Sequence, residues 1–261
     1  MALLEGKKAL IFGVANERSI AWGIAKAFHE QGAQVGLSYA GEVLEKRVRP
    51  LGERINAWLV EPCDVSKDSD IQSIADRVSK DIGEVDILVH SIGFANRDEL
   101  SGPYYNTTRE GFHLAMDISV YSFTALAKAF QPFIRPGGAL LTMTYYGAKK
   151  VFQNYNVMGI AKAALEASMR YLAYDFGSQG VRVNAISAGP VRTLAAAGVS
   201  GFKLMYRRYP EVAPLHQQIT IEDIGNAAVF LCSDFSAKTT GEVLYVDSGY
   251  NILGIPVPEE E

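Results

Sequence analysis

The stretch Ala9-Leu10-Ile11-Phe12-Gly13-Val14-Ala15-Asn16-Glu17-Arg18-Ser19-Ile20-Ala21-Trp22-Gly23 predicts the fold, because an apolar strand, a glycine turn and a helix start follow one another. The strand is Ala9–Phe12, and Gly13 permits a tight turn at its end. Ser19 is a natural N-cap for a helix that runs to about Gln31. A helix N-terminus at this junction favours a pyrophosphate. The turn differs from the G-x-G-x-x-G fingerprint, so alone it is weak evidence for a nucleotide site.

Short apolar runs alternate with helical patterns along the rest of the chain. Further strands are predicted at 34–38, 57–60, 86–90, 139–144, 181–186 and 243–246. Further helices are predicted from about residue 42 and at about 68–82, 108–133, 155–176 and 221–232. Alternation of buried strands with crossover helices predicts an α/β protein: a doubly wound Rossmann fold, with a seven-stranded parallel sheet covered by helices on both faces. We expect a single dinucleotide-binding and catalytic domain over residues 1–261.

Composition and charge argue against several kinds of partner. The chain has 261 residues, 48% of them hydrophobic, and a formal net charge of −4 without a long basic run, so nucleic acid is not expected. No apolar run reaches the ~18 residues of a membrane span, and the N-terminus lacks a secretory signal. The sequence therefore predicts a cytoplasmic protein. Cys63 and Cys232 lie far apart and form no metal-ligand cluster, and residues 256–261 predict a frayed tail.

Ligand-compatible residues follow four of the predicted strands, at the edge where open parallel sheets bind their ligands. Gly13 follows the first strand, Ser91-Ile92-Gly93 the fourth, and Gly189-Pro190-Val191-Arg192-Thr193 the sixth. Asp64-Val65 follows the third strand. Asp64 either reads the edge of an adenine or caps the next helix, and both interpretations stay open. Together the four strand ends predict a nucleotide site.

Tyr155 and Lys162 are the candidate catalytic pair. They stand seven residues apart in a run of good helix formers, so about two helical turns place them on one face. A fixed lysine charge can lower the pKa of a tyrosine, and the ammonium can donate to ligand hydroxyls. Gly159 lies between them and leaves room for a flat group to approach. Taken alone, the pair also fits two ordinary surface residues of an amphipathic helix.

Five motifs extend these observations: Ser19-Ile20-Ala21, Cys63-Asp64-Val65, His90-Ser91-Ile92-Gly93-Phe94-Ala95, Tyr155-Asn156-Val157-Met158-Gly159 and Gly189-Pro190-Val191-Arg192-Thr193-Leu194-Ala195. With them the chain resembles the short-chain dehydrogenase/reductase superfamily from Gly6 to about Asn251. It is most similar to the NADH-dependent enoyl-acyl carrier protein reductases of bacterial fatty-acid synthesis. Ketone-reducing relatives place their tyrosine four residues before the lysine, where this chain has Met158, and a serine where it has Tyr145. Both departures favour the enoyl reductases.

The resemblance implies a mechanism and a set of site residues. NADH would reduce the trans-2 double bond of an enoyl chain on acyl carrier protein. Tyr155 would stabilise the enolate oxygen, and Lys162 would hold the nicotinamide ribose. Tyr145 would line the pocket with a secondary acid/base or positioning role, and Ala95 would contact the acyl chain through its backbone. The cofactor-binding set is Gly13, Ser19, Ile20, Ala40, Asp64, Val65, Ser91, Ile92, Gly93, Lys162, Val191, Thr193, Leu194 and Ala195.

Two other interpretations of the function stay open. One is a reductase of another enone or carbonyl substrate, and the other is a non-catalytic dinucleotide-binding regulator of the same fold. The intact Tyr155–Lys162 pair argues against the regulator. NADH is favoured over NADPH because Ala40-Gly41-Glu42 follows the second strand, where NADPH binders usually place Arg or Lys. His90 ends a buried strand and is expected to be structural, and His113 lies on an amphipathic helix.

The segment at about 192–214 predicts a substrate-binding lid. Loops of this length in a compact domain are usually functional, and here small residues precede bulky apolar ones. Lys203, Arg207 and Arg208 form a basic cluster that would steer the acidic acyl carrier protein to the pocket, although they also fit an ordinary solvated helix end.

The expected assembly is a homotetramer, which the resemblance implies. The predicted helix 108–133 is apolar on two sides, whereas a surface helix of a monomer needs one apolar stripe. The first row is Phe112, Met116, Ser119 and Phe123, and the second is Leu114, Ile118, Tyr121 and Ala125. The alternative is a helix buried within its own chain.

Overall fold

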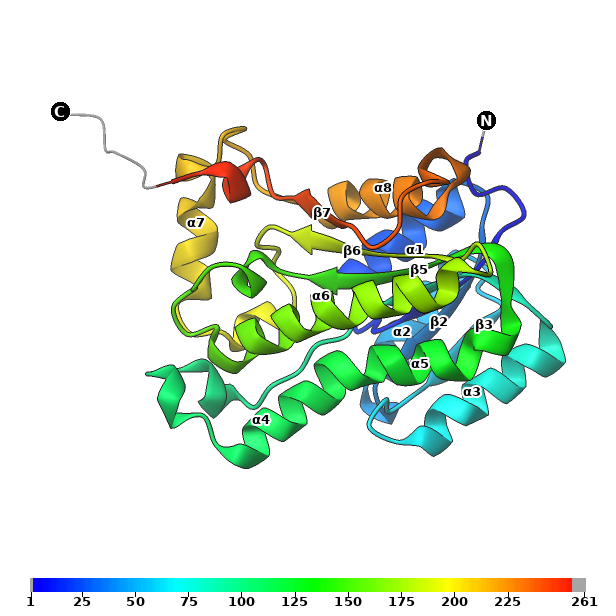
Figure 1. Cartoon of the computed structure of the whole chain (residues 1–261), viewed down its shortest axis with the longest axis horizontal. Coiled ribbons are helices and arrows are strands. Elements are labelled where there is room, and N and C mark those ends of the chain that lie inside the picture. Colours follow the sequence, from blue (N-terminus) through cyan, green and yellow to red (C-terminus); the bar gives the residue numbers. More distant parts are fainter. Residues whose placement is uncertain (1, 255–261) are drawn as a thin grey trace.

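A seven-stranded parallel sheet forms the centre of the computed structural model, which describes residues 2–254 (Figure 1). The strands are β1 (Lys8–Phe12), β2 (Gln34–Tyr39), β3 (Leu59–Pro62), β4 (Val85–His90), β5 (Ile134–Thr144), β6 (Arg182–Ala188) and β7 (Val243–Val246). Their order is β3-β2-β1-β4-β5-β6-β7, and every neighbouring pair is parallel. This arrangement confirms the predicted doubly wound Rossmann fold, with its switch in strand order between β1 and β4. The predicted tail at 256–261 lies outside the described residues.

Helices cover both faces of the sheet (Figure 1). They are α1 (Ile20–Glu30), α2 (Glu45–Arg54), α3 (Asp68–Asp81), α4 (Arg109–Met116), α5 (Ser122–Phe130), α6 (Asn156–Gly177), α7 (Phe202–Val212) and α8 (Ile221–Cys232). One core joins α1, α2 and α8 to one face, and the other joins α3, α5 and α6 to the opposite face. Strand β1 shows the reason: Ala9 and Ile11 enter the first core, while Leu10 and Phe12 enter the second.

The predicted helix 108–133 is confirmed as one run of helical turns that begins at Arg109 and contains an irregular turn. It consists of α4, a π-helical turn at Asp117–Tyr121, and α5. Ser119 is fully buried in that turn, where its hydroxyl accepts from the N–H of Phe94 at 2.9 Å and donates to the Phe94 carbonyl at 3.1 Å. The wider turn thus binds the loop that follows β4 to the α4–α5 unit, in keeping with the tendency of π-helical turns to occur at functional sites.

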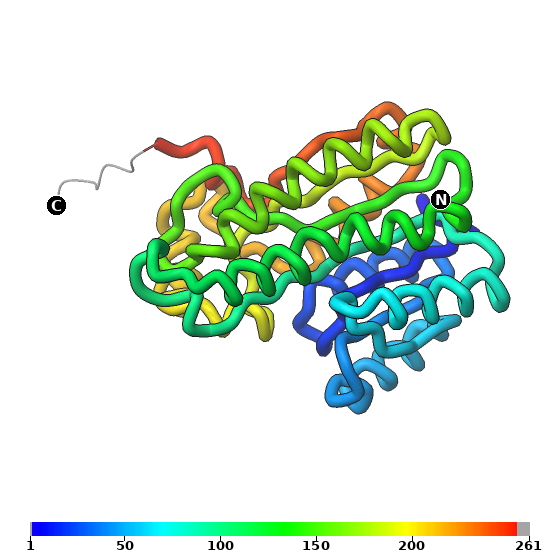
Figure 2. Tube along the Cα trace, turned by 60° about the horizontal axis from the view of Figure 1, so that its bottom comes forward, coloured from blue at the N-terminus to red at the C-terminus, as the bar shows by residue number. Residues whose placement is uncertain are grey.

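The second apolar row of this segment is covered unevenly by the chain itself, and Leu114 is half-buried. Ala125 is buried and Ile118 packs against the second core, whereas Tyr121 keeps 53% of its surface exposed. One residue of the four is therefore buried in the core of the chain, and the role of this row in an assembly stays a prediction. The long α4–α5 unit can be followed in Figure 2 beside α6.

The segment at about 192–214 is not an open loop. A 3₁₀ turn at Ala196–Gly198 leads into α7, whose Tyr209 is buried and donates its hydroxyl hydrogen to the Asp247 carbonyl at 2.7 Å. Helix α7 lies at the same end of the molecule as the loop after β4 (Figures 1 and 2). Within residues 2–254, no helix is both long and apolar enough to cross a membrane.

Candidate active site

A cavity of about 1570 Å³ opens at the carboxyl ends of the strands, between the sheet and α7. It is lined by the residues that follow β1 to β6 and by the segment that leads to α7. All predicted site residues lie on its wall: Gly13, Ser19, Ile20, Ala40, Asp64, Val65, Ser91, Ile92, Gly93, Ala95, Tyr145, Tyr155, Lys162, Val191, Thr193, Leu194 and Ala195. The fold therefore brings together side chains from distant parts of the sequence.

The turn after β1 is suited to a pyrophosphate. A Cβ on Gly13, whose φ is +100°, would lie 2.1 Å from the carbonyl oxygen of Ser91, so only glycine fits. Ser19 stands at the N-cap of α1, but its hydroxyl donates to the Asn16 carbonyl at 2.6 Å and makes no capping bond. The predicted capping by Ser19 is therefore wrong at the level of the side chain. The first-turn N–H groups of α1, beginning at Ile20, are left without that partner at the cavity wall.

Asp64 lies on the cavity wall after the edge strand β3 and does not cap a helix. Its Oδ1 accepts from the N–H of Ser66 at 3.1 Å and from the Ser66 hydroxyl at 2.6 Å, whereas the N-cap of α3 is Lys67. These hydrogen bonds lower the pKa of the Asp64 carboxyl, which stays ionised at neutral pH. Of the two interpretations left open, helix capping is wrong.

Lys162 is held inside the protein by backbone oxygens. The residue is only 7% exposed, and its ammonium donates to the carbonyl of Met143 at 2.9 Å and to that of Ile92 at 3.2 Å. Gly93 makes room for it, because a Cβ there would lie 3.3 Å from Nζ. Gly93 therefore serves the lysine as well as the cavity. Tyr155 stands one residue before the first residue of α6, and both side chains reach the same cavity.

Burial controls the protonation of this pair. It raises the pKa of Tyr155 well above its usual value, so the expected lowering by Lys162 is wrong. Burial also lowers the pKa of Lys162, to about 8, although the nearby charge of Glu166 opposes this change. At neutral pH Tyr155 is a neutral hydroxyl donor and Lys162 is a cation.

Tyr145 and Tyr155 pack together at the inner wall. Their ring centroids lie 4.9 Å apart with an edge-on geometry, and burial raises the pKa of Tyr145 as well. The Tyr145 hydroxyl points at Sδ of Met205 in α7, at 3.6 Å. Gly159 was expected to admit a flat ligand, but a Cβ there would lie 3.0 Å from the Gly147 carbonyl. Gly159 instead admits the loop that follows Tyr145.

Two residues with functional contacts were missed in the sequence. Ser119 supports the loop after β4, and no sequence signal marks the π-helical turn that carries it. Glu166 is 1% exposed and stands one helical turn after Lys162, a spacing that could have identified it. His90 is structural as predicted: it is fully buried, with ring nitrogens 2.8 Å from the hydroxyls of Thr142 and Ser122. His113 is exposed on α4. Among residues 2–254 no group of three His, Cys, Asp or Glu side chains could hold a metal.

The strand order and the tyrosine–lysine pair at the switch point define the class of short-chain dehydrogenases/reductases. A family model described as Enoyl-(Acyl carrier protein) reductase matches residues 13–251. The chain belongs to this family. This confirms the family predicted from the motifs.

Individual relatives agree closely over their whole length. The Aquifex aeolicus enoyl-[acyl-carrier-protein] reductase [NADH] is 54% identical over 100% of this chain and 97% of its own, and its crystal structure superposes with a TM-score of 0.95, covering 97% and 99% of the two chains. An Anaplasma phagocytophilum reductase in complex with NAD is 46% identical, with a TM-score of 0.92 and coverage of 97% and 95%. A Bacillus cereus reductase with NADP+ and an indole naphthyridinone is 49% identical, with a TM-score of 0.95 and coverage of 98% and 100%.

Proposed function

We propose that this protein is an NADH-dependent enoyl-acyl carrier protein reductase, an oxidoreductase that reduces the trans-2 double bond of an enoyl chain in fatty-acid elongation. The observation that carries the proposal is the placement of Tyr155 and Lys162 on the wall of one cavity. The ketone-reducing members of the wider superfamily place their tyrosine at the position that Met158 occupies in this chain. Membership of the enoyl reductase family and about half-identical NADH-dependent relatives support the same activity.

The residues present fit a dinucleotide. Gly13 and the N-terminus of α1 suit the pyrophosphate. The ionised carboxylate of Asp64 can accept a hydrogen bond from the donor groups on the edge of an adenine. The further residues that would hold the cofactor are Ser19, Ile20, Ala40, Val65, Ser91, Ile92, Gly93, Lys162, Val191, Thr193, Leu194 and Ala195. When bound, NADH supplies a hydride to the β-carbon of the enoyl thioester.

Tyr155 and Lys162 have separate tasks in this reaction. Because the pKa of Tyr155 is raised by burial, its hydroxyl keeps its proton and donates a hydrogen bond to the thioester oxygen as negative charge develops there. The ammonium of Lys162 has three N–H donors, and two of them are used by the carbonyls of Ile92 and Met143. The third donor is available to a ligand. With NADH bound, this donor would hold the ribose hydroxyls of the cofactor.

The acyl chain occupies the apolar part of the cavity. Tyr145 and the backbone of Ala95 border the reacting end. The apolar wall also includes Phe94, Phe152, Met158, Val199, Phe202 and Met205. Residues 192–214 act as the lid of a single domain, and contact of Met205 with the Tyr145 hydroxyl supports a closed position over the reacting end.

The physiological setting follows from the substrate. The enoyl chain is presented by acyl carrier protein, a partner that the exposed Lys203, Arg207 and Arg208 attract. The enzyme works in the cytoplasm as a homotetramer. Two buried free cysteines, Cys63 and Cys232, are consistent with a reducing compartment.

An assay of NADH consumption with crotonyl and longer enoyl thioesters tests the proposed function. The wild type should turn over with these substrates, with a higher kcat/KM for NADH than for NADPH because no cation follows β2 at Ala40-Gly41-Glu42. Tyr155→Phe should lower kcat by about 10²-fold or more with little change in NADH affinity. Lys162→Met should weaken NADH binding more than it slows the chemical step.

Tyr174→Phe is the matched control, since Tyr174 lies on the same helix and is 86% exposed. Normal turnover by Tyr155→Phe with a long-chain substrate would show that Tyr155 has another role. Turnover of ketones but not enoyl thioesters would favour the reductase of another substrate, and NADH binding without any turnover would favour the regulator.

A further inference from the structure

We propose that Glu166 is a positioning residue of this active site, which keeps Lys162 in its protonated form and fastens α6 to the end of β5. The inference rests on the proposed function, because Lys162 acts there on the cofactor. Glu166 touches neither the cavity nor the reacting atoms, so it acts through the lysine.

The contacts of Glu166 run parallel to those of Lys162. Lys162 donates to the Met143 carbonyl at 2.9 Å, and the hydroxyl of the next residue, Thr144, donates to Oε1 of Glu166 at 2.9 Å. One turn of α6 is thereby attached at two consecutive residues of β5. On the other side, Oε2 of Glu166 lies 3.1 Å from the ammonium of Lys149, in the loop that follows Tyr145. Glu166 therefore joins the helix of Lys162 and Tyr155 to the strand and loop that carry Tyr145.

Burying a carboxylate costs desolvation free energy unless nearby positive charge offsets this cost. Glu166 is 1% exposed, and two ammonium groups face it: Lys149 in direct contact, and Lys162 one helical turn away. Lys162 has no acidic partner within salt-bridge distance among the described residues, so its charge depends on the field of Glu166. Burial lowers the pKa of Lys162 to about 8 even with Glu166 in place. Without the carboxylate, a large fraction of Lys162 would be neutral at physiological pH.

Tyr245 and His90, two titratable groups near Glu166 and Lys162, are uncharged at neutral pH. Tyr245 of β7 faces Glu166, and burial raises the pKa of this tyrosine. His90 of β4 lies near Lys162, and burial lowers the pKa of the imidazole to about 3. The local charge balance is thus set by Glu166, Lys149 and Lys162 within the part of the chain that the structure describes.

The test compares the pH dependence of Glu166→Gln and Lys149→Met with that of the wild type. Glutamine keeps the shape and the hydrogen bond from Thr144 but removes the charge, so the alkaline limb of kcat/KM for NADH should move to lower pH by about one unit. Lys149→Met leaves the carboxylate in place and removes a competing cation, so its alkaline limb should stay in place or move to higher pH. NADH binding, followed by fluorescence over the same pH range, should change in the same direction.

A shift to lower pH in Glu166→Gln that Lys149→Met does not show separates an electrostatic role from a structural one. A lower melting temperature for Glu166→Gln with an unmoved alkaline limb would overturn the proposal. If Glu166→Gln does not fold, the double variant Glu166→Gln/Lys149→Met takes its place. Its limb should move to a lower pH than that of Lys149→Met, because the two variants differ only in the carboxylate. If the wild type binds NADH but reduces no enoyl thioester, the proposed function is wrong, and the binding profiles alone decide the role of Glu166.

Discussion

Single residues in this protein behave differently from their free counterparts because neighbouring segments exclude water from them. His90 illustrates this: the Ser122 hydroxyl gives its hydrogen to the Ile118 carbonyl at 2.6 Å, so Nε2 of His90 must donate to Ser122. Nδ1 then accepts from Thr142. The ring is satisfied in its neutral form, and burial lowers its pKa to about 3.

His90 should make the folded state sensitive to acid. The unfolded chain binds a proton at His90 below about pH 6.5, whereas the folded chain resists it until about pH 3. Stability is therefore full above about pH 6.5 and is lost as the pH falls through this window, by about 2 kcal/mol between about pH 6.5 and about pH 5. Urea unfolding of His90→Gln should show a shallower pH dependence than the wild type.

His113→Gln is the control for this measurement, because His113 is exposed on α4. Equal slopes for His90→Gln and the wild type would contradict the assignment. NMR of the wild type gives a second measurement. The chemical shift of the His90 imidazole should not change with pH between about pH 5 and about pH 8.

At the scale of elements, irregular segments rather than regular ones shape the site. The π-helical turn at Asp117–Tyr121 lets Ser119 support the loop after β4. The proposed lid contains helix α7, in which Tyr209 donates to the Asp247 carbonyl and Met205 contacts the Tyr145 hydroxyl. The cations of α7 lie on exposed positions, and Lys203, Arg207 and Arg208 form no salt bridge within residues 2–254. They are available to an acidic partner.

Changing Lys203, Arg207 and Arg208 together to Glu should raise KM for an enoyl chain on acyl carrier protein, more at low salt than at high salt, because long-range attraction to the acidic carrier is reversed. KM for a small coenzyme A thioester should change much less. Steady-state kinetics with both substrates at two salt concentrations measure this.

A control of equal charge change uses three exposed lysines near the ends of elements that lead back to the amino edge of the sheet, namely Lys80, Lys128 and Lys238. Their replacement by Glu should leave both KM values nearly unchanged. Equal effects of the lid variant on both substrates would mean that its cations serve the folding of the lid and not carrier docking.

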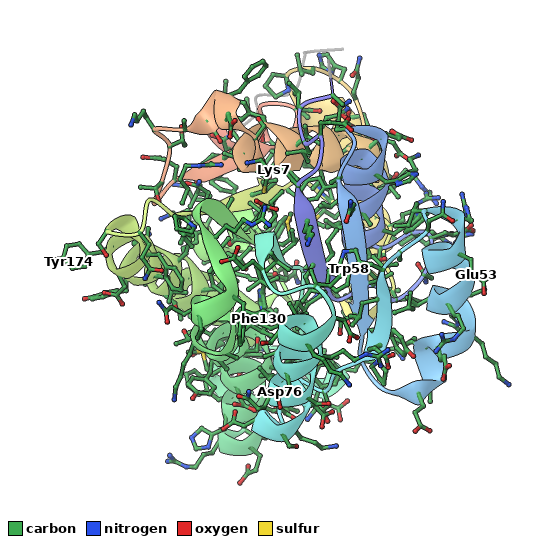
Figure 3. All side chains as sticks on the ribbon, turned by 90° about the vertical axis from the view of Figure 1, so that its right-hand side faces the viewer. Lys7, Glu53, Trp58, Asp76, Phe130 and Tyr174 are labelled. Carbon is green, nitrogen blue, oxygen red and sulfur yellow. The ribbon has the colours of Figure 1, made fainter. Side chains whose placement is uncertain are left out.

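At the scale of the whole molecule, helix α6 has a face that the rest of the described chain leaves uncovered. Along α6, exposed or half-exposed residues recur at helical spacing, and most of them are apolar: Ile160, Ala163, Ala167, Tyr171 and Tyr174. Tyr171 and Tyr174 are 76% and 86% exposed, and Tyr174 projects away from the body of the protein (Figure 3). A second copy packed on this stripe would cover it, which supports the proposed homotetramer.

Light scattering at micromolar concentration should therefore give about four times the mass of one chain. Tyr171→Glu together with Tyr174→Glu should lower the mass, because charges would be buried at the interface. Tyr105→Glu, at an 84% exposed tyrosine outside α6, is the control and should leave the mass unchanged. A monomer mass for the wild type would exclude the tetramer.

The sequence alone determined the alternation of strands and helices, the edge of the sheet at which the site lies, and the identity of the residues around it. These features depend on periodicity and turn chemistry, which are local in the chain: Gly13, Asp64 and Gly93 all lie within three residues of the end of the preceding strand. Strand β7 and helix α8 also agree with the predicted bounds for this reason.

Tertiary packing sets the protonation states, the supporting contacts and the conformation of residues 192–214. Burial of Tyr155 and Lys162 comes from segments far away in the sequence, and it reverses the pKa change that spacing suggested for the tyrosine. Glu166 meets Lys149 and Thr144 only after α6 has packed on the end of β5. Desolvation and charge fields depend on distances through space, which local sequence patterns do not contain.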